Sequence, residues 1–130
     1  MSNNDGIVSS AFGIIIDKDI AIVKATDKSI LHSQAQEFNR IFELLKNNGY
    51  IRFILDLSIC DYISSEGLTC AASCWKWCHD DGNGHMVIIV PQKPENEVRN
   101  LFDIIGLSRM VGSALQPKLS NAIRYLREFS

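Results

Sequence analysis

The pattern of apolar and polar positions divides the chain into short strand-like runs and longer helix-like runs. Two runs rich in Ile and Val, at Ala11–Ile16 and Asp19–Ala25, are separated by Asp17 and Lys18. Short apolar runs joined by two polar residues are typical of a tight hairpin. We therefore expect two antiparallel strands at the start of the folded part of the chain.

Two further runs are almost continuously apolar, at Ile51–Leu57 and Met86–Val90. Strands of this kind are usually covered on both faces, as in the middle of a parallel sheet. Arg109–Val111 is a candidate for a short edge strand.

A first helix is predicted after the polar stretch Thr26–His32. Ser33 and Gln36 have the spacing of a capping box at its start, and Asn47–Gly49 supplies a stop signal. The apolar positions at helical spacing are Phe38, Ile41, Phe42 and Leu45.

Three more helices are predicted from the same periodicity. The second spans Ser65–His79 and ends in a turn at Asp80–Gly84, the third spans Glu95–Gly106, and the last spans Leu119–Phe129. Their expected inner faces are Leu68, Ala71, Ala72 and Trp75 in the second; Val98, Leu101, Phe102 and Ile105 in the third; and Ala122, Ile123 and Leu126 in the last.

This order of elements predicts an α/β layer fold with about four helices. The sheet is expected to be mixed and mostly parallel, with the antiparallel hairpin at its start. A chain of 130 residues favours a single domain, which we place at 11–130 after a disordered polar tail at 1–10.

Charge and hydropathy exclude several classes of function. The formal net charge of -2, with scattered basic residues, disfavours nucleic-acid binding, which normally needs a basic face. Residues 1–10 lack the features of a signal peptide, and the apolar runs are too short to cross a bilayer. We expect a cytoplasmic protein without membrane insertion.

Four cysteines in such a chain are expected to be thiols, not disulfides. Cys70, Cys74 and Cys78 form one stripe along the second predicted helix, with His79 beside it. One helix cannot surround a tetrahedral ion, and no CxxC pair is present. We therefore expect these cysteines to be small packing residues without a bound metal, although a reactive thiol stays an alternative.

The richest candidate chemistry lies between Ile54 and Leu68. Asp56 and Ser58 end an apolar strand, and Ser64 and Ser65 open the second helix. A phosphate at a helix N-terminus would be stabilised by backbone N–H groups and by the helix dipole. A serine at this place is also commonly a simple N-cap, and strand-end polar residues commonly satisfy loop backbone groups.

Three segments resemble conserved patterns of the STAS domain, the fold of bacterial anti-sigma-factor antagonists. Ile54–Ser58 (ILDLS) resembles its "lDlS" strand, and Tyr62–Leu68 (YISSEGL) resembles its "fiDSsGl" phosphorylation loop. Leu101–Leu107 (LFDIIGL) resembles the end of its third helix. The three occur in the family's order and spacing, and the resemblance covers roughly residues 11–129.

The resemblance implies that Ser65 is the serine phosphorylated by a partner kinase. It also implies a partner-binding surface made of Asp61, Ile63, Ser64, Glu66 and Gly67. Two positions depart from the family pattern: Ser64 stands where many members have aspartate, and Glu66 where a small residue is usual. Asp61 is alternatively a solvated turn residue, and Gly67 alternatively permits the close approach of a neighbouring strand.

The expected function is that of an anti-sigma-factor antagonist that binds an anti-sigma factor with serine kinase activity. A serine phosphatase is a further candidate partner, and no cofactor is expected, because the chain has no GxxxxGK[ST] loop for ATP. One alternative is a scaffold or transport-associated STAS subunit without phosphorylation. A remote alternative is an enzyme with Cys60 as nucleophile, which lacks the following Arg of a phosphate loop; otherwise no catalytic residue is expected.

Overall fold

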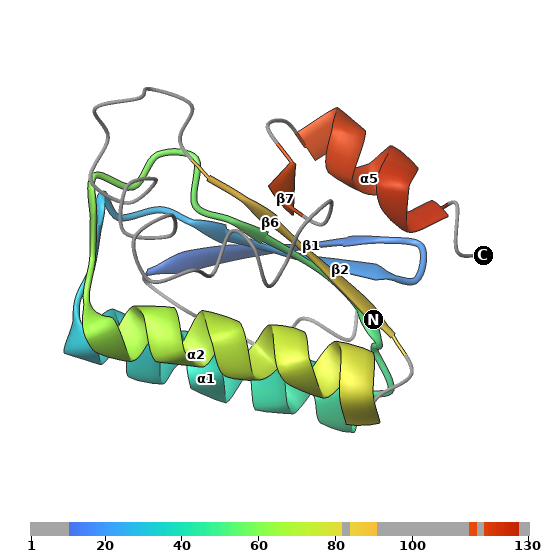
Figure 1. The fold of residues 1–130 in the computed structure, drawn as a ribbon, viewed down its shortest axis with the longest axis horizontal. Coiled ribbons are helices and arrows are strands. Elements are labelled where there is room, and N and C mark those ends of the chain that lie inside the picture. The colour runs from blue at the N-terminus through green and yellow to red at the C-terminus, as the bar shows by residue number, and fades with distance from the viewer. Residues whose placement is uncertain (1–10, 82–83, 91–114, 117–118, 128–130) are drawn as a thin grey trace.

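A mixed five-stranded sheet forms the centre of the protein (Figure 1). The computed structural model describes residues 11–81, 84–90, 115–116 and 119–127. In spatial order the strands are β1 (Phe12–Asp17), β2 (Ile20–Ala25), β4 (Arg52–Asp56), β6 (His85–Ile89) and β7 (Leu115–Gln116). The predicted mixed, mostly parallel sheet is confirmed, because only β1 and β2 pair antiparallel.

The predicted hairpin is confirmed. Asp17 pairs with Ile20 at its end, and Lys18 in the turn has a φ of 57°. The two apolar runs predicted as central strands are β4 and β6, and β4 lies between β2 and β6.

Helices cover both faces of the sheet (Figure 1). The helices α1 (His32–Asn47) and α2 (Ser65–Lys76) pack on one face, and α5 (Leu119–Arg127) packs on the other. In α5, Ala122 and Leu126 are buried and Ile123 is partly buried, as predicted. The core beneath α5 consists of Ile20, Ile22, Ile54, Val87 and Ile89.

The start of α1 differs from the prediction. The prediction of a capping box between Ser33 and Gln36 is wrong, because the helix begins at His32 and Ser33 therefore already lies in its first turn. Gln34 is the N3 residue of the capping box, because its Oε1 accepts a hydrogen bond from the N–H of the N-cap residue Leu31 at 3.0 Å. The helix ends as predicted, with Gly49 at a φ of 93°.

The inner face of α2 is also rotated from the prediction. Leu68 and Ala71 are buried as expected, but Ala72 and Trp75 are only partly buried. Cys74 and Cys78 lie in the core, at 2% and 0% exposure, which confirms the packing role expected of these cysteines.

A π-helical segment, Trp77–Asp81, continues the chain directly after α2. Part of the predicted turn therefore belongs to a helical segment. Gly84 closely approaches the backbone just before β4, because a Cβ there would lie 1.9 Å from the Ile51 carbonyl oxygen.

Several predictions fall outside the described residues. These are the tail at 1–10, the third helix at Glu95–Gly106 and the edge strand at Arg109–Val111. The edge strand that the structure describes beside β6 is β7.

The packing of α2 on the sheet predicts the effect of a charge at Leu68, which is 8% exposed. Leu68→Asp should unfold the domain, because an unpaired buried charge costs several kcal/mol against a total stability of roughly 5–15 kcal/mol. Urea unfolding followed by circular dichroism measures this. The exposed Ser73 on the same helix provides the control, Ser73→Asp, which should stay folded. A cooperatively folded Leu68→Asp protein would show that the inner face of α2 is misassigned.

Candidate functional site

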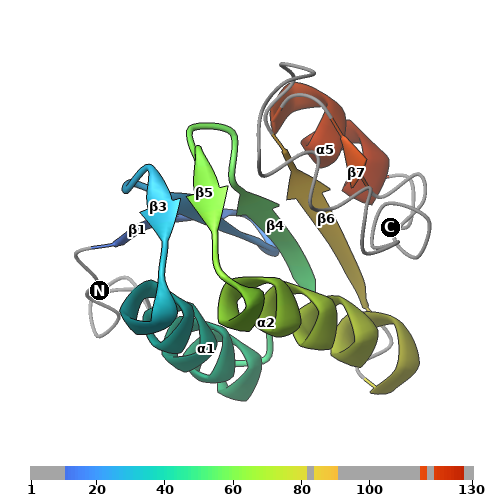
Figure 2. The ribbon, with the colours of Figure 1, turned by 60° about the vertical axis from the view of Figure 1, so that its left-hand side comes forward.

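Two short strands hold the starts of α1 and α2 together. The strands β3 (Ser29–Ile30) and β5 (Tyr62–Ile63) form a separate two-stranded parallel sheet that the sequence analysis did not predict. The Ser64 N–H donates to the Ile30 carbonyl at 2.7 Å, which continues the pairing to the helix starts. Figure 2 shows β3 and β5 side by side, each leading into a helix.

Ser64 is the N-cap of α2. Its backbone is extended, with φ -74° and ψ 166°, and its Oγ accepts a hydrogen bond from the Gly67 N–H at 3.2 Å. The residue is only 8% exposed. Of the two adjacent serines, Ser64 therefore has the structural capping role.

Ser65 is the first residue of α2 and is exposed. Its carbonyl oxygen accepts a hydrogen bond from Thr69 Oγ at 2.9 Å. Ser65 is thus accessible to another protein at the positive end of a helix dipole.

The Glu66 side chain is exposed beside Ser65 in the first turn of α2. Hydrogen bonding from its own backbone N–H, and then from the Ser64 side chain, lowers the pKa of Glu66 below its ordinary value. The His32 imidazole at the start of α1 also helps to lower this pKa, with its Nδ1 4.0 Å from Glu66 Oε1.

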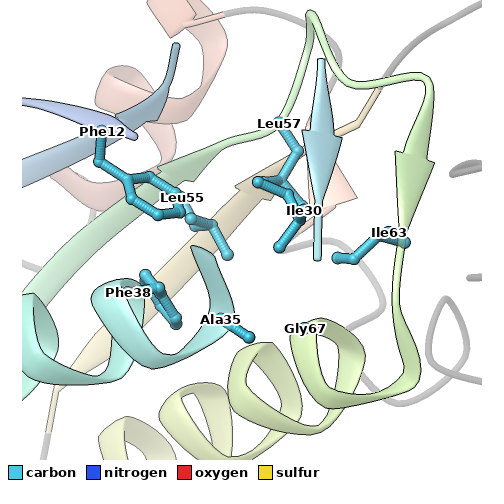
Figure 3. Close-up of a pocket in the computed structure, with 8 residues that line it drawn as sticks. All are labelled: Phe12, Ile30, Ala35, Phe38, Leu55, Leu57, Ile63 and Gly67. Carbon is cyan, nitrogen blue, oxygen red and sulfur yellow. The ribbon is translucent and has the colours of Figure 1, made fainter. Parts of the chain in front are cut away.

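Gly67 permits the close approach of α2 to the β3–β5 pair. A Cβ at Gly67 would lie 2.8 Å from Ile63 Cγ1 and 2.9 Å from Ile30 Cγ2. Of the two interpretations of Gly67, the structure therefore supports the close approach of a neighbouring strand. Gly67 also borders an apolar pocket of about 220 Å³, counting its opening, between the helices and both sheets (Figure 3). The other lining residues are Phe12, Ile30, Ala35, Phe38, Leu55, Leu57 and Ile63.

The six residues predicted for partner contact or phosphorylation lie together but differ in exposure. Asp61, Ser65 and Glu66 are exposed, whereas Ile63, Ser64 and Gly67 are buried. The buried three can affect a partner only by shaping the surface.

Three exposed apolar side chains in the segments before the helices were not predicted as part of the site. These are Leu31 at 47% exposure, Ile59 at 40% and Tyr62 at 39%. The sequence does contain a signal for them, because each is a large apolar residue in a connecting segment that is otherwise polar. They give this end of the molecule an apolar component that a protein partner could cover.

Comparison with known proteins identifies the fold. No protein-family model and no curated protein sequence matched the chain. Among solved structures, an anti-sigma factor antagonist from Mycobacterium paratuberculosis superposes with a TM-score of 0.75, at 16% identity, over 89% of this chain and 92% of that one. A putative anti-sigma factor antagonist from Thermotoga maritima gives a TM-score of 0.70, at 22% identity, over 91% and 96%.

A third similar structure is the Bacillus cell-fate determinant SpoIIAA in its phosphorylated form. It gives a TM-score of 0.69, at 13% identity, over 90% of this chain and all of that one. The chain has the STAS fold. This confirms the fold that the sequence resemblance implied.

Polar groups at the end of β4 have local structural partners in this STAS fold. Asp56 is 5% exposed, and its Oδ1 accepts a hydrogen bond from the Ser58 N–H at 3.0 Å. Cys60 is buried beside Asp56, Asp61 and Asp27. Burial first, and then these carboxylates, raise the pKa of Cys60 to about 12, which disfavours the nucleophilic thiolate.

The histidines near the far end of α2 take part in packing. The rings of His79 and Trp75 stack at 4.3 Å, and His85 lies edge-on to His79 at 5.3 Å. The Met86 N–H donates to His79 Nε2 at 3.4 Å. Desolvation lowers the pKa values of both histidines, so their neutral forms are favoured here.

The cysteine stripe yields a prediction about metal content. Within the described ranges, no three His, Cys, Asp or Glu side chains are grouped to hold a metal ion. Cys74 and Cys78 are core residues, and burial raises the pKa of Cys74 well above its ordinary value, which opposes thiolate ligation. Elemental analysis of protein purified without chelator should find no stoichiometric metal. One zinc ion per chain would contradict the packing role of the stripe.

The close contact at Gly67 yields a second prediction. Gly67→Ala should destabilise the protein by roughly 1–3 kcal/mol, because the methyl group overpacks the contact with Ile30 and Ile63. Helix propensity alone predicts the opposite, a gain of about 0.5–1 kcal/mol. Chemical denaturation separates the two, with Ser73→Ala on the exposed face as control. A stabilised Gly67→Ala protein would show that the contact is not tight.

Proposed function

We propose that the protein is an anti-sigma-factor antagonist that acts through the N-terminal end of α2. In the proposal this end binds an anti-sigma factor with serine kinase activity, and phosphorylation of Ser65 releases it. The observation that carries the proposal is the placement of an exposed serine as the first residue of α2 in a STAS fold. One of the similar structures is of a protein in its phosphorylated form.

The proposed chemistry is supplied by the partner. The kinase transfers the terminal phosphoryl group of its bound ATP to Ser65 Oγ. The bond to the bridging oxygen of ADP breaks, and the hydroxyl proton passes to a base of the kinase. This chain contributes the accessible hydroxyl on a rigid helix start and no catalytic group of its own. The high pKa of Cys60 supports a binding protein over a cysteine enzyme.

The surface around Ser65 suggests how a phosphate would reverse binding. Leu31 and Tyr62, in the segments that lead directly into α1 and α2, offer exposed apolar area, and covering it with a partner would stabilise a complex. A phosphate adds about -1.5 to -2 charges at the same surface. Burying that dianion against apolar groups and beside Glu66 would be costly, so the complex would dissociate.

The resulting cycle is a partner switch. The unphosphorylated protein holds the anti-sigma factor and so frees the sigma factor for transcription. The phosphorylated protein lets the anti-sigma factor return to its target, and a serine phosphatase resets the cycle. This cycle belongs in the cytoplasm. Over the described residues, the helices are too short or too polar to cross a membrane.

One feature favours a second candidate, a scaffold or transport-associated subunit without phosphorylation. Glu66 places a charged side chain directly after Ser65, at a position where the family usually has a small residue. The neighbourhood of the gene distinguishes the two candidates. A kinase and phosphatase beside it support the switch, and a transporter operon supports the subunit.

The switch predicts different behaviour for the two serines. A pull-down from the native host with mass spectrometry identifies the partner, and radiolabelled ATP then tests the phosphorylation site. Ser65→Asp should weaken binding to that partner, and Ser65→Ala should bind at least as well as the wild type. Ser64→Ala should cost about 1 kcal/mol of stability, because it removes the N-cap.

Isothermal titration with the purified partner measures these affinities, and the Ser73→Ala variant controls for general effects on α2. Label on Ser64, or no label on either serine while the partner still binds, would contradict the switch. The unlabelled outcome would favour the scaffold or transport candidate.

A further inference from the structure

The outermost strand of the five-stranded sheet is apolar and lacks the usual protection of a sheet edge. β1 is the first strand in the spatial order, and among the described residues it pairs with β2 alone. The pairing runs from Phe12 to Asp17 without a bulge, and the strand contains no Pro or Lys. Proteins usually protect an edge with a bulge, a Pro or a charged side chain. In β1 the single charge, on Asp17, stands at the end of the strand.

The register of the hairpin determines which backbone groups of β1 point outward. The Thr26 N–H donates to the Ala11 carbonyl at 2.9 Å, so Ala11 and every second residue after it bond to β2. Ile14 and Ile16 lie between these residues, and their N–H and C=O groups therefore point away from β2. These are the donors and acceptors that a further strand would use.

The side chains of β1 divide between the two faces of the sheet. Ile14 and Ile16 pack against the core under α1 and α2 and are partly buried. Ile15 lies on the opposite face, next to Ile22 of β2, which belongs to the core under α5. Ile15 is nevertheless 52% exposed, the largest exposure among the large apolar side chains that the structure describes. The edge therefore offers an apolar side chain as well as backbone groups.

We propose that the edge of β1 binds a second copy of this chain, in antiparallel pairing with Ile15 opposite Ile15 of the second copy. In this register Ile14 of each copy lies opposite Ile16 of the other, and these pairs exchange the outward N–H···O=C bonds. The twofold axis passes between the two Ile15 side chains. They form a non-hydrogen-bonded pair, in which side chains approach most closely. The same strand thus fills both sides of the interface, as a twofold dimer requires.

The charges beside the edge fit this occupant and this register. Gly13 lies opposite Asp17 of the second copy, and on its other side it pairs with Lys24 of β2. Neighbouring strands lie about 4.8 Å apart, so Lys24 and that Asp17 are roughly 10 Å apart at their Cα atoms, within reach of their side chains. Gly13 has no side chain to separate the ammonium from the carboxylate. The dimer forms this pair twice, and Lys24 is exposed and able to take part.

The inference is independent of the proposed function. None of the three isoleucines of β1 is among the residues predicted for partner contact or phosphorylation. Dimerisation through β1 can therefore be tested on the full chain without an anti-sigma factor or a kinase.

Sedimentation equilibrium of the full chain, from about 10 µM to about 1 mM, measures the association. The wild type should show a monomer–dimer equilibrium. Ile15→Lys should be monomeric over the whole range, because it places like charges directly opposite each other. The control is Ile51→Lys, which changes another exposed isoleucine just before β4 and should dimerise like the wild type. Circular dichroism establishes that both variants are folded.

Ile15→Cys tests the register. In a non-hydrogen-bonded antiparallel pair the Cα atoms lie about 4.5 Å apart, within the range that a disulfide spans. Two such thiols give up two hydrogens to diamide, a thiol oxidant, and form one disulfide. Ile15→Cys should therefore give a covalent dimer on a gel without reductant, whereas the wild type and Ile51→Cys should stay monomeric under the same conditions.

A wild type that stays monomeric at every concentration would overturn the inference and would leave a strand of another protein as the occupant of the edge. A dimer that Ile15→Lys leaves intact would show that the chains associate elsewhere. Cross-linking of Ile15→Cys no greater than that of Ile51→Cys would contradict the register. None of these results would affect the proposed phosphorylation of Ser65.

Discussion

The pairing of β3 with β5 determines where this protein presents its polar chemistry. Each strand has only two residues, yet the pair continues directly into the starts of α1 and α2. The Ser64 N–H donates a hydrogen bond to the Ile30 carbonyl, and Gly67 has no side chain to hold the elements apart. Both features let α2 pack against this strand pair. Two helix N-termini, with their dipoles pointing the same way, consequently lie next to each other at one end of the molecule.

This constraint gives adjacent residues different roles. Ser64 is held in extended backbone and becomes a buried cap, whereas Ser65 enters the helix and stays exposed. A single-residue shift in the start of α2 would exchange the two serines, so the cap geometry decides which one a kinase could reach.

The strongly periodic elements could be predicted from the sequence. Continuous apolar runs predicted β4 and β6, because a central strand is buried on both faces. Apolar residues at helical spacing predicted α1 and α5, because each of these helices buries one face on the sheet. The two-residue strands were missed, since no pattern is visible over so short a length. The inner face of α2 was predicted only in part, because helical spacing includes both Trp75, which is partly buried, and Cys74, which is buried, and does not rank them.

The candidate site was predictable in location and less so in detail. The resemblance of Tyr62–Leu68 to a family pattern placed the loop, and the structure brings all six predicted residues to one end of α2. The exposure of each depends on the β3–β5 pairing, which no local pattern indicated.

The central claim is that a protein partner binds at the paired starts of α1 and α2. Amide hydrogen exchange of the full chain, measured with and without the anti-sigma factor that it binds, tests this most directly. We expect slower amide exchange in residues 26–33 and 58–69 when the partner is bound, with little change in α5. Protection confined to α5 or to the β1–β2 hairpin would contradict it.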